Sequence, residues 1–158
     1  ECEAALERLK TVIDIKSLGE LSEEEFEKNR SVIADPVKER RAKHAVYENQ
    51  RTIKAVAALM ANDIEEFGKL MIASHESLRD DYEVTGTELD TLVSAALSQE
   101  GVIGSRMTGA GFGGCTVSIV RTGAVDAFIK NVGGIYKDKI GYAADFYVVD
   151  AGCGPHTL

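Results

Sequence analysis

A glycine-rich loop between two apolar segments is the feature that most restricts how this chain can fold. Residues 107–114 read Met-Thr-Gly-Ala-Gly-Phe-Gly-Gly, and the β-branched residues that follow, from Cys115 to Val120, predict a buried strand. Glycine adopts positive φ without steric cost and lets the backbone approach another group closely. Such a loop can direct several N–H donors at one anion, which predicts a phosphate nearby, whereas the structural alternative is a tight turn between two strands.

Size and charge limit the classes of function. The 158 residues are the length of one domain, and such a chain can bury about 70% of its extended surface. The 26 acidic and 18 basic residues give a net charge of −8, which argues against nucleic acid and anionic membranes and favours small molecules or proteins as partners. Three widely spaced cysteines predict neither a disulfide framework nor a zinc site. Without a signal peptide or an apolar run of about 18 residues, we expect a cytoplasmic protein.

Apolar residues at helical spacing predict five helices before the loop. The expected helices cover residues 1–16, 23–30, 36–61, 64–78 and 87–97. The expected cap residues are Ser22 with Glu25, Asp35 with Pro36, Asp63 and Thr87, and Gly101 is the expected stop of the fifth helix. Because the chain opens with Glu1, inside the first helix and without a methionine, we expect that an N-terminal part of a longer protein is missing.

Two groups of polar side chains on these helices are candidate acid–base sites. Residues three or four positions apart predict a ladder of ion pairs and hydrogen bonds along one helix face: Arg41, His44, Glu48 and Arg51 or Thr52. His44 titrates near neutrality and could act as an acid or base, although a helical histidine beside a glutamate is more often structural. Ser74 and His75 resemble part of a Ser/His pair, but no third group is predicted to orient them, so we expect interhelical or active-site-edge hydrogen bonds.

The second half of the chain predicts a small sheet. Strands at 102–108 and 115–120 flank the loop, and an antiparallel hairpin is the simplest pairing. A helix at 125–132, weakened by the two glycines that follow, precedes a last strand at 146–149, and this succession favours a right-handed crossover. The expected fold class is α+β, with several helices followed by a small, mainly antiparallel sheet. In the tail, Cys153 and His156 are too few ligands to predict a metal site.

The loop and several other segments resemble one enzyme family. The stretch from Arg106 to Cys115 resembles the third signature motif of the GHMP kinases, which phosphorylate small molecules. Its Met-Thr before the glycines and its Phe-Gly-Gly-Cys end are similar to the members that phosphorylate galactose. Further segments resemble those members in the same order along the chain: 1–5, 41–51, 74–78, 81–85 and 88–90. The glycines at 133–134 and the tail after Asp150 depart from the family pattern.

The resemblance implies that residues 1–158 form the C-terminal, ferredoxin-like domain of a two-domain kinase. It implies transfer of the γ-phosphoryl group of ATP to the anomeric hydroxyl of galactose. ATP and Mg²⁺ would be bound mainly by the missing N-terminal domain, which would also supply the catalytic residues, so no catalytic or metal-binding residue is assigned to this chain. The glycine loop is expected to lie near substrate and phosphate through Thr108, Gly109, Ala110, Gly111, Phe112, Gly113 and Gly114.

Three alternatives remain open from the sequence. The first is a galactose and ATP sensor that acts through a partner protein without phosphorylating the sugar. The second is another GHMP kinase with a different small-molecule substrate. The third is a purely structural role for this part of the protein, which alone is expected to fold but to be inactive. An oligomer of the isolated chain would then be an artefact, because the face left by the absent domain promotes association.

Overall fold

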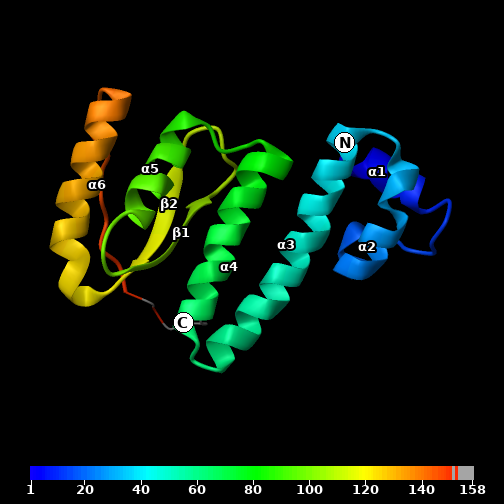
Figure 1. Ribbon diagram of the computed structural model, residues 1–158, viewed down its shortest axis with the longest axis horizontal. Helices are drawn as coiled ribbons and strands as arrows, with labels where there is room; N and C mark the ends of the chain where they lie inside the picture. The colour runs from blue at the N-terminus through cyan, green and yellow to red at the C-terminus, as the bar shows by residue number, and fades with distance from the viewer. Residues whose placement is uncertain (151, 153–158) are drawn as a thin grey trace, which may run out of the picture.

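Two helices that pack side by side form the middle of the protein in the computed structural model (Figure 1). The structure describes residues 1–150 and 152. The helices are α1 (Cys2–Leu9), α2 (Glu23–Asn29), α3 (Pro36–Met60), α4 (Ile64–Ser77), α5 (Thr87–Leu97) and α6 (Val125–Ile140), and the strands are β1 (Val102–Thr108) and β2 (Cys115–Val120). The central pair is α3 and α4. Helices α1 and α2 pack on α3. The β1–β2 hairpin packs on α4 through β1, and α5 contacts both strands and α6. The expected α+β class is confirmed.

Three predicted helix starts are confirmed by their caps. Ser22 Oγ accepts the Glu25 N–H at 3.2 Å, and Glu25 Oε2 accepts the Ser22 N–H at 3.0 Å, which makes a reciprocal capping box. Asp35 Oδ1 accepts two N–H groups of the first turn of α3, at 3.0 and 3.2 Å. Asp63 Oδ1 accepts an N–H of α4 at 2.9 Å. These short polar side chains satisfy N–H groups that have no partner inside the helix.

The first helix is shorter than its prediction. It ends at Leu9 instead of continuing to residue 16. The chain turns there because Ile15, Leu18 and Leu21 are all buried in the same core as Leu9, which a straight helix would not allow.

Three other differences from the predicted boundaries involve glycines. Gly86, with φ of +85°, is the N-cap of α5, so Thr87 is the first residue of that helix and not its cap. Helix α5 ends before Gly101, which therefore is not its stop. Helix α6 continues through 133–134 and ends at Gly141, where φ is +94°, because glycine adopts the left-handed conformation of a C-cap easily.

The sheet consists of two antiparallel strands in the described part of the chain. β1 and β2 pair as predicted, with Ser105 opposite Ser118 and Thr108 opposite Cys115. The prediction of a last strand at 146–149 is wrong, and so is the prediction of a right-handed crossover that depended on it. Residues 143–150 form no regular structure, turn or bend, and no backbone hydrogen bond joins them to β2.

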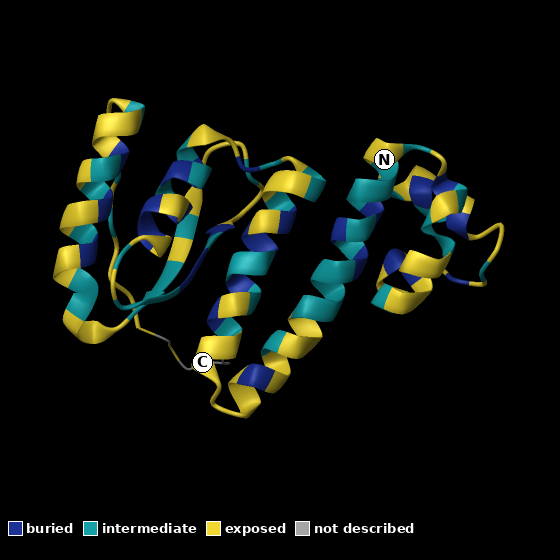
Figure 2. Cartoon of the chain, in the orientation of Figure 1, coloured by how far each residue is buried: buried dark blue, intermediate teal, exposed yellow. Residues whose placement is uncertain are grey.

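Buried side chains gather in two clusters, as Figure 2 shows by the dark faces of the helices. One cluster joins α1, α2 and α3, and Phe26 is its largest fully buried member. The other joins α5 and α6, where Phe128 packs against Phe146 with a ring separation of 6.3 Å. Among the described helices, none is both long and apolar enough to cross a bilayer.

Candidate functional site

The glycine loop is anchored at one point and exposed elsewhere. The Phe112 N–H donates to the Val84 carbonyl at 2.9 Å. A Cβ on Gly111 would overlap that same carbonyl oxygen, so only glycine fits at this position. The φ values of Gly109, Gly111, Phe112 and Gly113 are all positive, between +57° and +90°. Such a run of left-handed residues is strained for any side chain and is held here by the contact with Val84.

The free part of the loop offers backbone donors. The Phe112 side chain is 81% exposed, and a Cβ on Gly109 or Gly113 would meet no atom within 4 Å. In the described part of the chain, the N–H groups of Ala110, Gly111, Gly113 and Gly114 have no hydrogen-bond partner. Backbone donors arranged in this way suit an anion such as a phosphate.

A charged network lies behind the loop and joins three elements. Glu48 of α3 accepts a hydrogen bond from Ser74 Oγ of α4 at 2.5 Å on one carboxylate oxygen, and from Arg51 Nε at 2.8 Å on the other. Arg106 of β1 places Nη1 3.1 Å from Ser74 Oγ and 3.4 Å from Glu48 Oε1. The network therefore fixes the strand that leads into the loop against both central helices.

The network also determines the charge of Glu48. Burial is the largest single influence and raises the pKa of the carboxyl, but the hydrogen bonds from Ser74 and Arg51 and the Arg51 charge together lower it below its usual value. Glu48 is therefore ionised at neutral pH. It neutralises one of the two guanidinium groups beside it.

A groove of about 370 Å³ connects this network to the loop. Its polar side is formed by Glu48, Arg51, Ser74, Arg106 and Thr108, the last residue of β1. Its apolar side is formed by Phe67, Leu70, Met71, Val117 and Ile119. Two cations beside one anion make the polar side weakly positive, which suits the neighbourhood of a bound phosphate.

His75 is buried behind β1 and is held on both ring nitrogens. Its Nδ1 accepts the N–H of Met107 at 3.2 Å, which places the ring proton on Nε2. Nε2 lies 3.2 Å from Asp90 Oδ1 of α5, although the two groups are not aligned for a hydrogen bond. Burial lowers the pKa of His75, and the Asp90 charge opposes that shift. His75 is thus a neutral link between α4, β1 and α5.

His44 has a structural environment as well. Its Nδ1 lies 3.0 Å from Ser77 Oγ, and Ser77 Oγ donates to Asp81 Oδ2 at 3.1 Å. Because the single hydroxyl proton of Ser77 is directed to Asp81, His44 is the donor to Ser77. The ring also stacks on Tyr82 at 4.5 Å, and burial lowers the pKa of His44. Lys43 completes the chain with an ion pair to Asp81 at 3.1 Å.

The structure groups the predicted polar residues differently from the sequence prediction. In the expected ladder, Arg51 bonds to the Glu48 carboxylate, but Thr52 Oγ1 donates only to the Glu48 backbone carbonyl. His44 bonds to Ser77 on another helix, and Arg41 bonds to Glu1 and Glu83. Ser74 and His75 do not bond to each other, as expected, and their bonds are interhelical or to β1.

The sequence prediction missed the roles of two residues of the site, Asp90 and Arg106. We expected no third group beside His75, but Asp90 lies there. Arg106 entered the sequence prediction only as the first residue of the glycine-loop motif, and no role was predicted for its side chain. No local spacing could have found either contact, because they join residues 15 and 58 positions apart, as the numbers of His75 and Asp90 and of Glu48 and Arg106 show.

No cluster of metal-ligating side chains is present among residues 1–150 and 152. The Cys153 and His156 pair lies outside the residues that the structure describes.

The chain is similar to known proteins in sequence and in structure. The family model described as GHMP kinases C terminal matches residues 55–138. The galactokinase of Clostridium acetobutylicum is 65% identical to the chain over 158 residues, and that of Clostridium beijerinckii is 62% identical over the same length. Each match covers 100% of this chain but 41% of the relative, so the chain spans less than half the length of these proteins.

A solved structure supports the same relationship. Lactococcus lactis galactokinase, complexed with galactose, superposes with a TM-score of 0.90 and 54% sequence identity. The superposition covers 92% of this chain and 38% of that chain.

Proposed function

The chain belongs to the GHMP kinase family, and from that premise we propose that it is the C-terminal domain of a galactokinase. The complete polypeptide would transfer the γ-phosphoryl group of ATP to the anomeric hydroxyl of galactose and release galactose 1-phosphate and ADP. The observation that carries this proposal is identity of 62–65% to two galactokinases along the whole of the chain.

The glycine loop supports the proposal through its chemistry. Phosphoryl transfer depends mainly on positioning and on stabilising negative charge, which backbone N–H groups can provide without a proton acceptor. We place residues 108–114 beside the sugar and the terminal phosphate. The loop would shape the cleft and hold the phosphate-binding part of the other domain.

ATP and Mg²⁺ are assigned to the N-terminal part. Mg²⁺ prefers carboxylate and phosphate oxygens. Two carboxylates of the site, Glu48 and Asp90, are turned towards Arg51 and His75. This chain would therefore contribute the wall of the site, and its partners would be galactose and ATP.

The test is ADP release by the complete polypeptide with Mg-ATP. Galactose is compared with glucose, mevalonate and homoserine as acceptors, at equal concentrations. ADP release that requires galactose supports the proposal, and release with mevalonate or homoserine instead would assign another GHMP activity. Measurable galactose binding without ADP release from any acceptor would indicate a sensor. The same assay on the 158-residue chain alone is expected to give no release.

A further inference from the structure

Arg41 of α3 binds the segment that follows α4 through two of its nitrogens. Its Nη1 donates to the Asp81 carbonyl at 2.6 Å, and its Nη2 donates to Glu83 Oε2 at 2.5 Å. Its Nε donates to Glu1 Oε2 at 3.0 Å. The Arg41 side chain is only 12% exposed, and arginine is rarely buried to this extent without partners. Two direct contacts therefore fix the segment to α3.

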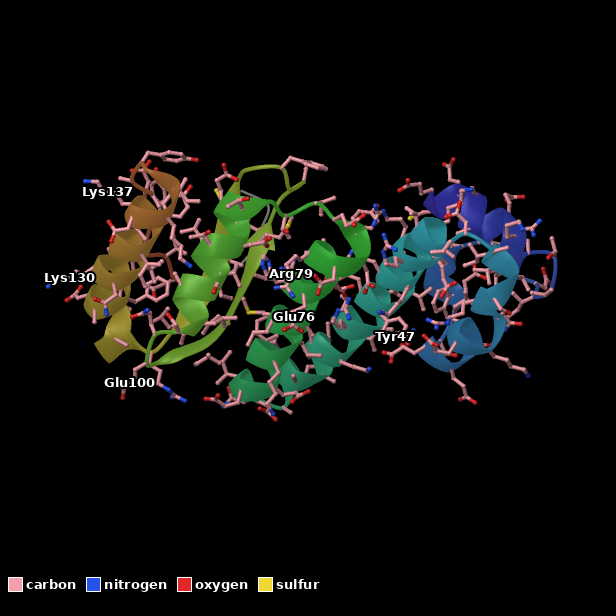
Figure 3. The ribbon with its side chains drawn as sticks, turned by 45° about the horizontal axis from the view of Figure 1, so that its top comes forward. Tyr47, Glu76, Arg79, Glu100, Lys130 and Lys137 are labelled. Carbon is pink, nitrogen blue, oxygen red and sulfur yellow. The ribbon has the colours of Figure 1, made fainter. Side chains whose placement is uncertain are left out.

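The backbone of this segment is irregular and needs support. Residues Leu78–Tyr82 form a π-helical turn, and Glu83 follows in the left-handed conformation, with φ of +58°. Carbonyl groups in the last turn of a helix lack partners inside it, and Arg41 supplies one for Asp81. A left-handed residue with a Cβ is strained, so its surroundings must hold it. Figure 1 and Figure 3 show the end of α4, where Arg79 is labelled in Figure 3, between α3 and the hairpin.

The same segment anchors the glycine loop one residue further on. The carbonyl of Val84, which follows Glu83, accepts the Phe112 N–H at 2.9 Å. This oxygen also lies where a Cβ on Gly111 would be. In the described part of the chain, no other hydrogen bond joins residues 109–114 to a segment outside the hairpin. The position of the loop therefore depends on the position of this one carbonyl.

The neighbouring arginine shows which property of Arg41 matters. The hydrogen bond from Arg41, and then its charge, lower the pKa of the Glu83 carboxyl, so this pair is ionised at neutral pH. Arg40 Nη2 also lies 3.6 Å from Glu83 Oε1, but among the described residues it makes no hydrogen bond to the backbone of 81–84. The planar guanidinium of Arg41 instead joins a carbonyl and a carboxylate at once. Arg40 is thus a cation of equal charge without this geometry.

We propose that Arg41 is a positioning residue that holds the glycine loop in place through the Val84 carbonyl. It fixes Asp81 and Glu83 to α3, and Val84 follows them directly. The N–H groups of the loop keep one direction only while this carbonyl keeps its place. Without Arg41 the segment is released from α3, and the loop moves with it. The anchoring is independent of the proposed function, whereas its effect on turnover rests on that function.

Hydrogen exchange in the complete polypeptide tests the anchor directly. Arg41→Ala should make the Phe112 amide exchange at least about 10-fold faster, because local opening of its bond is no longer opposed. The amide of Val46, a fully buried residue of α3, reports global unfolding. Arg40→Ala is the matched control and should change neither rate. If Phe112 exchange accelerated no more than Val46 exchange in Arg41→Ala, the role of Arg41 would be general stability, and the proposal would be overturned.

A variant of Glu83 separates the anchor from the stability of the fold. Asparagine adopts the left-handed conformation more easily than glutamate, and its side chain is shorter and uncharged. Glu83→Asn should therefore leave the Tm nearly unchanged and still accelerate exchange at Phe112. A lower Tm with wild-type exchange at Phe112 would contradict the anchor.

The ADP-release assay gives the consequence for turnover. Arg41→Ala and Glu83→Asn should lower kcat more than they raise the KM for galactose, because displaced loop donors stabilise the transition state less. Arg40→Ala should keep both constants. Wild-type kcat in both anchor variants would overturn the positioning role in the reaction. A wild-type protein without ADP release would refute the kinase proposal and leave the exchange result standing, so the two failures are distinguishable.

Discussion

Gly68 of α4 and Gly104 of β1 bring a helix and a strand into direct backbone contact. A Cβ placed on Gly104 would lie 2.6 Å from Gly68 Cα, and a Cβ placed on Gly68 would overlap the Ile103 carbonyl. Neither neighbour is a flexible side chain that could turn away. The contact sets how closely the hairpin approaches the central helices, and it thereby positions Arg106 beside Glu48.

Alanine at either glycine should therefore separate the helix from the strand. We expect Gly104→Ala to lower the free energy of unfolding by about 2 kcal/mol, within the range for overpacked cores. Gly123→Ala is the control, because its Cβ would meet nothing within 4 Å. Urea denaturation measures both. A Gly104→Ala protein as stable as the control would show that the contact is easily relaxed.

The Glu48 network should contribute to stability mainly above the pH at which its carboxyl titrates. The pKa of Glu48 is lowered in the folded protein, so the unfolded chain binds more protons in the acid range, and the contribution is lost as pH falls below about 4.3. We expect Glu48→Gln to cost about 2 kcal/mol at pH 7 and progressively less as the pH falls through the acid range to 3.5. Ser74→Ala should cost about 1 kcal/mol, since Arg51 still holds the carboxylate. Denaturation at the two pH values checks this, and a pH-independent cost of Glu48→Gln would contradict it.

His75 should make the protein less stable in mild acid. Its pKa is lowered by burial, so between its folded and unfolded values only the unfolded chain is protonated, and stability falls as pH drops below about 6.5. We expect His75→Asn to flatten the dependence of Tm on pH between 7.5 and 5.5, because asparagine does not titrate. Its amide oxygen can still accept the Met107 N–H, so the site stays folded. His44→Asn is the matched variant, since burial lowers that pKa too. Unchanged slopes in both variants would exclude these histidines as the cause.

Two glycines of the loop should separate folding from turnover. Gly111→Ala overlaps the Val84 carbonyl, so we expect it to lower both Tm and kcat of the complete polypeptide. Gly113→Val has open space but brings a branched side chain into the cleft, so kcat should fall far more than stability. Because no atom is in the way, the stability cost of Gly113→Val is the strain of a side chain at positive φ, about 1–2 kcal/mol. If Gly113→Val lowered Tm as much as Gly111→Ala, a role of this position in the reaction would lose its support.

The two glycines inside α6 should respond differently to alanine. Gly134 faces open space, so Gly134→Ala should stabilise the protein by about 0.5–1 kcal/mol, the usual difference between these residues in a helix. A Cβ on Gly133 would lie 3.3 Å from the Phe146 ring, so Gly133→Ala should gain less or nothing. Thermal unfolding of the two proteins is the measurement. Equal gains would mean that Phe146 does not hold the segment after α6 against this helix.

The sequence by itself determined the features that depend on neighbours along the chain. Ser22, Asp35 and Asp63 cap the helices they precede, because a cap bonds to N–H groups two or three residues away. The glycine loop and its hairpin were predictable for the same reason. The family resemblance rested on these local motifs, so it too was available before the structure.

Only the tertiary structure decided which distant groups meet. The Glu48–Arg106 pair and the contact between His75 and Asp90 join different elements, and helical periodicity contains no information about the helix or strand across the core. The segment 146–149 shows the same limit from the other side. It has the composition of a strand but forms none here, because a strand is completed by a neighbour and not by its own residues.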